Sequence, residues 1–112
     1  MDGKNFIQKG LKNGMTRILW NDEIYNGTTA SVVDVLGAEQ IKVQAVGTGT
    51  YTIKGRLNSN AQFDTICAIK VSDFSTKSTI SDTAIYTGDV SGYSQVTVDA
   101  SGFDSITAAL IG

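Results

Sequence analysis

Two neighbouring stretches of the chain alternate between apolar and polar side chains. In residues 40–46 every second position is apolar, at Ile41, Val43 and Ala45, and residues 50–58 alternate in the same way. A period of two is typical of a β-strand that buries one of its faces. The sequence Gly47-Thr48-Gly49 separates the two stretches and favours a tight connection. We therefore predict two strands joined as a hairpin.

Turn-forming residues divide the rest of the chain into further short apolar stretches. Additional strands are expected at residues 16–25, 30–36, 62–71, 84–89, 94–99 and 104–111. We expect a tight turn at Asn21-Asp22, a bulge within residues 62–71 and a polar loop over residues 73–82. The predicted fold is all-β: a single antiparallel β-sandwich of about seven or eight short strands. The sandwich domain is assigned to residues 16–112, and residues 1–15 to an extended N-terminal arm.

A local repeat marks the C-terminal part of the chain. Residues 89–97 match residues 99–107 at a spacing of ten, and each copy places a Ser-Gly pair before an aromatic residue. The pairs are Ser91-Gly92 and Ser101-Gly102, followed by Tyr93 and Phe103. Turns at such a spacing indicate an all-β sandwich or barrel. We predict a turn in both copies and both aromatic rings in the core.

Size and charge narrow the classes of function. The 112 residues suit one domain, and the net charge of 9 − 11 = −2 comes with basic residues that stand singly. Nucleic acid is therefore not an expected partner. No apolar stretch is long enough for a membrane span or a signal peptide, so we expect neither. Cys67, within the apolar residues 66–69, is interpreted as a buried, inert thiol rather than a reactive one.

The chain contains no histidine, which is the commonest general base and metal ligand. Without histidine, the usual catalytic triad of a nucleophile, a general base and a residue that orients the base cannot be assembled. We therefore expect no enzyme activity, no cofactor and no metal. Asp89, Asp99 and Asp104 beside the Ser-Gly pairs offer a calcium site as an alternative. The favoured interpretation is that these residues cap turns.

Aromatic residues allow two interpretations. In a small β domain they pack in the core or across strands, which is the favoured one. The alternative is a platform that stacks on sugars. The residues concerned are Trp20, Tyr25, Tyr51, Tyr86, Tyr93 and Phe103.

The N-terminal arm differs in charge from the rest of the chain. After Asp2 it contains three lysines and no acid, although the whole chain is acidic. We predict that it binds a negatively charged or groove-like surface of a partner protein; the alternative is a terminus with no role. The predicted partner-binding residues are Lys4, Phe6, Ile7, Lys9, Leu11 and Lys12.

Four stretches resemble small β-sandwich virion structural proteins of tailed bacteriophages. They are residues 50–58, 63–66, 86–93 and 96–98, within roughly the last two thirds of the chain. The resemblance implies a non-enzymatic virion protein, made in the host cytoplasm, that acts as a capsid decoration or head-fibre component. Its implied partners are other virion proteins, above all the major capsid protein, and further copies of itself, with a trimer favoured. A tail or baseplate subunit and a carbohydrate-binding module for host adsorption remain as alternatives.

Overall fold

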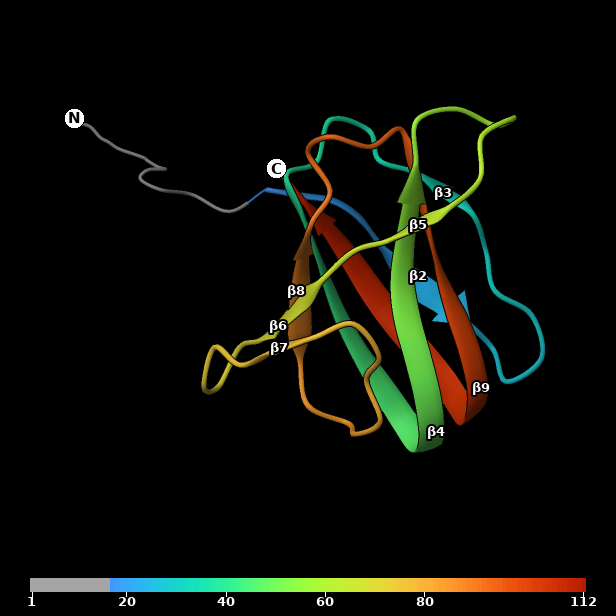
Figure 1. Ribbon diagram of the computed structural model, residues 1–112, viewed down its shortest axis with the longest axis vertical. Coiled ribbons are helices and arrows are strands. Elements are labelled where there is room, and N and C mark those ends of the chain that lie inside the picture. Colours follow the sequence, from blue (N-terminus) through green and yellow to red (C-terminus); the bar gives the residue numbers. More distant parts are fainter. Residues whose placement is uncertain (1–16) are drawn as a thin grey trace.

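The computed structural model describes residues 17–112, and all strand pairs in this part of the chain are antiparallel (Figure 1). The strands of residues 17–112 are β2 (Ile18–Tyr25), β3 (Val33–Asp34), β4 (Gln40–Arg56), β5 (Asp64–Thr65), β6 (Ala68–Lys70), β7 (Thr76–Lys77), β8 (Tyr86–Asp89) and β9 (Gln95–Ile111). Residues 17–112 contain no helix, and therefore none that is long and apolar enough to cross a membrane. The predicted all-β, antiparallel class is confirmed.

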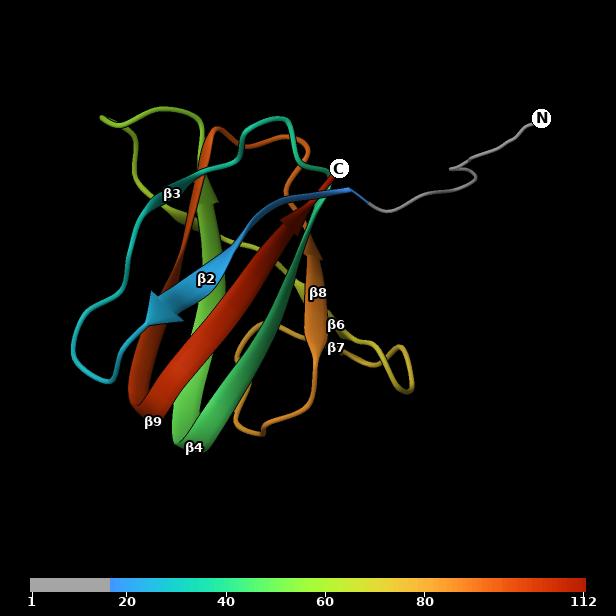
Figure 2. The same cartoon turned by 180° about the vertical axis from the view of Figure 1, so that it is seen from behind.

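Two long strands, β4 and β9, form the centre of the fold. Each has 17 residues, and they pair from Gln40 opposite Ile111 to Arg56 opposite Gln95. The register shifts between Val46 and Thr50, and there the two-stranded ribbon bends back over itself (Figures 1 and 2). Strands that bend in this way carry a sheet from one layer of a sandwich into the other. We term this region the bend.

The hairpin predicted between residues 40–46 and 50–58 is wrong. Both stretches are extended, but they belong to one strand, and both pair with β9 instead of with each other. The backbone at Gly47 has a φ of +102°, and a Cβ added at Gly49 would lie 2.3 Å from the carbonyl oxygen of Ser101. Glycine is therefore needed for a backbone bend and a close approach, and not for a hairpin turn.

The two layers are parts of one unclosed sheet. Its strand order is β2-β9-β4-β8-β6-β7, and this path includes the first half of β4 with the second half of β9. β5 pairs with the second half of β4, and β3 pairs with the first half of β9. Folding at the bend brings these halves over the first layer, which gives the β-sandwich-like form (Figure 2).

Alternate side chains of β4 and β9 fill the space between the layers. The rings of Tyr51 and Phe103 meet edge to face, with centroids 5.8 Å apart and planes at 62°. Burying a large apolar side chain contributes about 1.5–3 kcal/mol. The buried face predicted for residues 40–46 is confirmed. The largest buried side chains are Tyr51, Tyr86, Phe103, Ile24, Ile41, Ile53, Ile80, Ile106 and Leu110.

The N-terminal part of the sandwich differs from its prediction in two places. The tight turn at Asn21-Asp22 is wrong, because both residues lie inside β2 and pair with Ala109 and Ala108. The strand expected over residues 30–36 is reduced to β3. Asparagine and aspartate favour turns, but here pairing with β9 overrides that local preference.

The middle of the chain also differs from its prediction. The single strand expected over residues 62–71 is divided into β5, which pairs with β4, and β6, which pairs with β8. This segment therefore crosses from one layer to the other. The loop predicted over residues 73–82 contains the short strand β7. Of the strand predicted over residues 84–89, residues 86–89 form β8.

The two copies of the repeat have different structures. Ser91-Gly92 forms the predicted turn, closed by a 3.0 Å hydrogen bond from the amide of Tyr93 to the carbonyl of Val90. The turn predicted at Ser101-Gly102 is wrong, because these residues lie within β9 at the bend. Gly102 has a φ of +95° and packs against residues 48–49.

Candidate functional site

Loops from three parts of the chain meet at the end of the sandwich opposite the bend (Figure 1). We term this region the loop end; it consists of residues 34–39, 57–63 and 89–94. The amide of Val35 donates to the carbonyl of Ser94 at 2.9 Å, and the amide of Ser94 donates to the carbonyl of Arg56 at 2.9 Å. The amide of Val90 donates to the carbonyl of Glu39 at 3.0 Å. Backbone hydrogen bonds thus hold the loops together as one surface.

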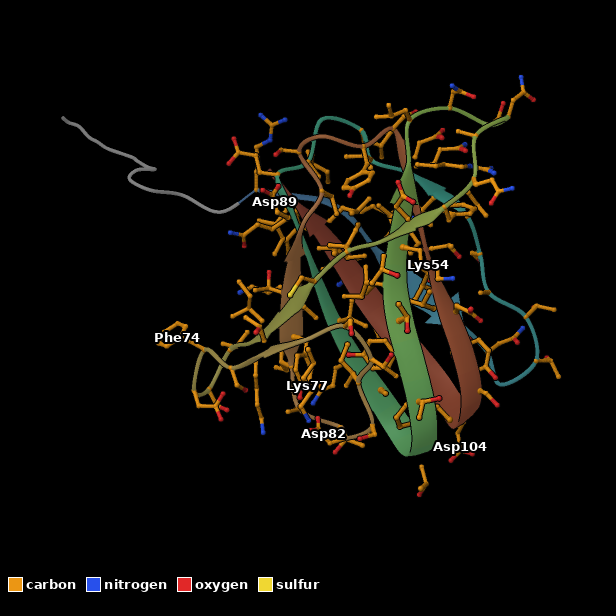
Figure 3. All side chains as sticks on the ribbon, viewed as in Figure 1. Lys54, Phe74, Lys77, Asp82, Asp89 and Asp104 are labelled. Carbon is orange, nitrogen blue, oxygen red and sulfur yellow. The ribbon has the colours of Figure 1, made fainter. Side chains whose placement is uncertain are left out.

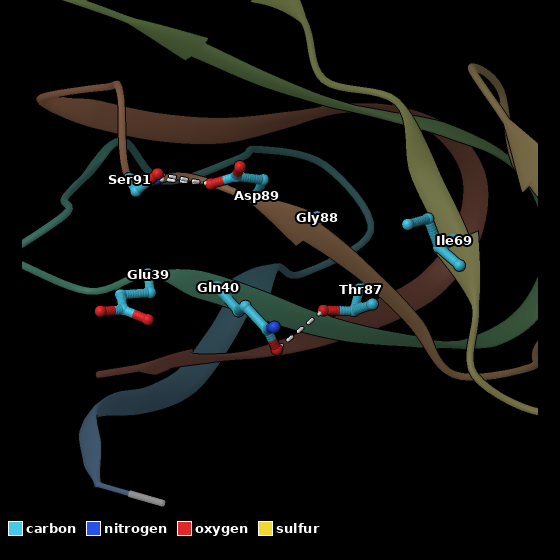
Figure 4. A pocket seen from close by; sticks show the side chains of 7 residues that line it. All are labelled: Glu39, Gln40, Ile69, Thr87, Gly88, Asp89 and Ser91. Atoms are coloured by element: carbon cyan, nitrogen blue, oxygen red, sulfur yellow. Dashed lines mark hydrogen bonds between the residues drawn. The ribbon is translucent and has the colours of Figure 1, made fainter. Parts of the chain in front are cut away.

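A groove of about 350 Å³ opens beside the loop end (Figure 4). Its lining residues are Glu39, Gln40, Ile69, Thr87, Gly88, Asp89 and Ser91. Two further hollows adjoin it, one along residues 34–39 and one between Leu57 and residues 64–67, and both share Ser91 with the groove.

The loop end and its groove are acidic. The charged residues that line the groove and the two hollows are Asp34, Glu39, Asp64 and Asp89. No lysine or arginine of residues 17–112 lines any of the three. A concave surface with charges of one sign attracts ligands of the opposite sign.

Apolar side chains stand among these acids. Leu57 is 68 % exposed and Leu36 is 59 % exposed, and each lines one of the two hollows. The half-buried Tyr93 lines both hollows and packs against the core. Leu36 has a φ of +60°, which is costly for a residue with a branched side chain. The surface can therefore contact a segment that carries both positive charge and apolar side chains. The alternation of residues 50–58 placed Leu57 on the buried face, which is wrong because β4 ends at Arg56 and Leu57 begins the loop. No sequence pattern marks Leu36 as exposed.

The three aspartates of the calcium alternative are placed apart. Asp89 accepts hydrogen bonds from the amide and hydroxyl of Ser91, at 3.0 and 2.7 Å, and these bonds lower the pKa of its carboxyl group. Asp99 pairs with Lys54 at 3.3 Å, and Asp104 lies at the bend beside Gly47. The predicted turn cap is thus confirmed for Asp89. Within residues 17–112 no three histidine, cysteine, aspartate or glutamate side chains cluster as a metal site would require.

The aromatic residues do not form a platform. Tyr25, Tyr51, Tyr86 and Phe103 are buried in the core, and Trp20 and Tyr93 are half-buried against it. The favoured interpretation as core packing is confirmed, and the sugar-stacking platform is contradicted.

The prediction for Cys67 is also wrong. The predicted buried thiol is exposed, because Ile66 and Ala68 take the two inward positions on either side of it. An apolar run does not show which of its alternate residues faces the core.

A buried polar cluster lies beneath the segment that leads from β7 to β8. The hydroxyl of Tyr86 donates to Asp82 at 2.9 Å, and Asp82 also caps the amide of Ala84 at 3.1 Å. The pKa of the Tyr51 hydroxyl is raised well above its usual range, mainly by burial and to a smaller extent by the nearby Tyr86 and Asp82. The Tyr86 hydroxyl and the Asp82 carboxylate hold this segment to the sheet, whereas the Tyr51 hydroxyl has no hydrogen-bond partner within residues 17–112. Their position favours a structural role.

The most exposed large apolar side chain of the described residues is Phe74, at 79 %. It stands at the tip of the β6-β7 hairpin with a φ of +62° (Figure 3). Ser75 donates to Asp73 through its amide and hydroxyl at 2.9 and 2.7 Å, which stiffens the tip. Sequence reasoning missed this residue, although an aromatic ring within a polar loop was a usable signal.

The predicted partner-binding residues Lys4, Phe6, Ile7, Lys9, Leu11 and Lys12 lie outside the described residues. The arm prediction, with its boundary at residue 15, therefore stays a prediction.

Two solved structures share this fold. The SPBc2 prophage-derived protein YomS is similar with a TM-score of 0.73 and 11 % identity, over 88 % of this chain and 96 % of YomS. The PBSX exported protein XepA is similar with a TM-score of 0.76 and 14 % identity, over 100 % of this chain and 42 % of XepA. The chain thus spans well under half of XepA. No protein-family model and no curated protein matches the sequence.

Proposed function

We propose that this chain is a non-enzymatic structural protein of a phage particle, acting as a capsid decoration or head-fibre component. The observation that carries the proposal is the fold shared with the prophage-derived YomS over nearly the whole of both chains. The resemblance of residues 50–58 and 86–93 to phage virion proteins supports the same role. The binding partners in this proposal are the major capsid protein and other virion proteins.

The chemistry of the described surface supports a role in binding rather than in catalysis. The groove beside the loop end contains carboxylates, an amide and hydroxyls, and the Asp89 carboxylate is engaged in capping its own turn. Such a surface can recognise a partner through charge and hydrogen bonds. The burial of Tyr25, Tyr51 and Tyr86 removes the observation on which the carbohydrate-binding alternative depended.

Self-association is part of the proposal, with a trimer favoured. β2 and β7 are the outer strands of the sheet order, and Ile18 on β2 is exposed. Outer strands present unpaired backbone groups, which symmetric assembly covers. Light scattering coupled to size exclusion measures the molar mass directly. A monomer at high micromolar concentration contradicts this part of the proposal.

Fractionation of phage particles tests the role itself. Particles of the phage that encodes the chain are separated into intact virions, heads and tails, and each fraction is examined by mass spectrometry. We expect the chain in intact virions and heads, and we expect purified protein to co-sediment with heads that lack it. Presence in tails alone replaces the head assignment with a tail or baseplate subunit. Absence from every particle fraction overturns the proposal.

A further inference from the structure

The first sixteen residues and the rest of the chain carry opposite net charges. Residues 1–16 contain three lysines and one aspartate, a net charge of 3 − 1 = +2. Residues 17–112 contain the remaining 9 − 3 = 6 basic and 11 − 1 = 10 acidic residues, a net charge of −4. The groove and hollows of the loop end are lined by four of these acids and by no basic residue of the described part. The basic segment and a surface complementary to it belong to one chain.

The attachment point of the basic segment lies beside the groove. The amide of Gly112 donates to the carbonyl of Arg17 at 2.8 Å, and the amide of Glu39 donates to the carbonyl of Ile111 at 2.8 Å. Gln40 is in turn paired with Asp89 across β4 and β8. β2, β9, β4 and β8 are neighbours in this order. Three strand spacings of about 4.8 Å, or about 14 Å in all, therefore separate the start of β2 from Asp89.

The lengths along the chain match this separation. Extended backbone covers about 3.3 Å per residue, so Lys12 can reach about 17 Å from Arg17 and Phe6 about 36 Å. The first distance reaches the carboxylates of Glu39 and Asp89. The reach of about 36 Å for Phe6 is enough to cross the loop end, because the described part of the protein measures 46 × 33 × 22 Å along its principal axes.

The apolar side chains of the segment also have counterparts. Phe6, Ile7 and Leu11 lie between the lysines in the sequence, and Leu36 and Leu57 are exposed among the acids of the loop end. Leu36 lines one of the two hollows that adjoin the groove and Leu57 lines the other, and exposed apolar side chains beside a concave surface are where apolar anchors dock. The charge of residues 4–12, their distance from the loop end and their apolar side chains thus all match the surface of the loop end.

We propose that residues 4–12 of this chain dock on its own loop end. Lys9 and Lys12 lie against Glu39 and Asp89, and the apolar residues lie against Leu36 and Leu57. Because the segment is tethered about 14 Å from the groove, its effective concentration there is in the millimolar range, and weak contacts suffice.

A spin label on the full chain tests this arrangement. Cys67 is the only cysteine, is exposed and lies against the hollow beside Leu57, so a nitroxide attached there reports on the loop end. We expect the label to remove the NMR amide signals of residues 4–12. The double variant Glu39→Gln/Asp89→Asn restores them, since it removes both charges while the new asparagine side chain can still cap the turn. The matched control is Asp104→Asn, which removes an exposed acid at the bend and leaves the signal loss unchanged (Figure 3).

Mixing distinguishes the chain's own segment from that of a second copy. Isotope-labelled chains without nitroxide are mixed with nitroxide-labelled chains without isotope, so that only the first kind gives NMR signals. If the segment docks on its own chain, the signals of residues 4–12 remain intact in this mixture. Signal loss in the mixture assigns the segment to a neighbouring copy and overturns the proposal as stated. Unchanged signals of residues 4–12 in the spin-labelled wild type overturn it altogether.

A measurement without any label guards against disturbance by the nitroxide. The double variant Lys9→Glu/Lys12→Glu is expected to shift the amide signals of Gly88, Asp89 and Ser91, and to leave those of the bend in place. In about 1 M salt, where the Debye length is about 3 Å, wild type is expected to show the same shifts. Absence of these shifts contradicts the docking, whereas the role in the phage particle depends on the separate fractionation experiment.

Discussion

The two ends of the sandwich are built from similar residues and behave differently. At the bend, Gly47, Gly49 and Gly102 let two backbones cross at distances that leave no room for a side chain. At the loop end, Gly37 and Gly92 have no atom within 4 Å of an added Cβ, and acids and leucines face solvent around a groove. Close backbone packing makes the bend a structural element. The open, charged surface of the loop end is the part available for binding.

Substitution of glycine at each end gives the largest expected contrast. Gly49→Ala places a Cβ against the carbonyl oxygen of Ser101, a backbone atom that can move only if the bend opens. We expect a loss of at least about 3 kcal/mol in the free energy of unfolding, or failure to fold. Gly92→Ala at the loop end is the matched control and is expected to stay within about 0.5 kcal/mol of wild type. Urea unfolding measures both. Equal losses at the two ends contradict the comparison.

The aromatic residues of the repeat test the same contrast in side-chain packing. Phe103 follows the glycine of the bend and is buried, whereas Tyr93 follows the glycine of the loop end and is half-buried. We expect Phe103→Ala to cost about 3–5 kcal/mol in unfolding free energy. Tyr93→Ala is expected to cost about 1–2 kcal/mol, since less area is buried. Similar costs for the two variants in thermal or urea unfolding argue against different roles for the two copies.

Leu36 offers a substitution that separates stability from binding at the loop end. Its φ of +60° is tolerated better by asparagine than by leucine. Leu36→Asn is therefore expected to raise the free energy of unfolding by roughly 0.5–1 kcal/mol. The same change removes an apolar contact for residues 4–12, so the spin-label effect on their signals should weaken. A variant that is both less stable and unchanged in docking contradicts both expectations.

The smallest expected effect is the pH dependence from Asp89. Its hydrogen bonds to Ser91 hold the pKa of the carboxyl group below the unfolded value, which is about 3.9. A lowered folded pKa contributes stability that is present above the unfolded pKa and is lost as pH falls through the folded one. We expect the melting temperature of Asp89→Asn to differ least from wild type below about pH 4. A difference that is constant from pH 3 to pH 7 contradicts this account.

Much of the fold could be predicted from local pattern, and the errors have a common cause. Period two in residues 40–46 correctly identified Ile41, Val43 and Ala45 as core, and Ser91-Gly92 was correctly predicted as a turn. The hairpin at Gly47-Thr48-Gly49 was wrong because a glycine pair permits either a turn or a bend. Cys67 was misplaced because a continuous apolar run leaves its inward face undefined.

The candidate surface was less predictable than the fold. Its acids come from residues 34, 39, 64 and 89, which are distant in sequence and meet only because β4 and β8 pair and the loops close over them. The exposure of Leu36, Leu57 and Phe74 depends equally on which loops reach the surface. Composition alone did indicate that residues 1–15 differ in charge from the remainder.

The sequence by itself determined the all-β class, the buried faces of residues 40–46 and 51–55, and the basic character of the N-terminal residues. These properties depend on side-chain polarity and on spacing along the chain. Only the tertiary structure decided that β4 and β9 form one bent ribbon, and that Asp34, Glu39, Asp64 and Asp89 surround one surface. The physical reason is that a strand pattern specifies which face is buried, while the choice of pairing partner depends on hydrogen bonds between residues far apart in the chain.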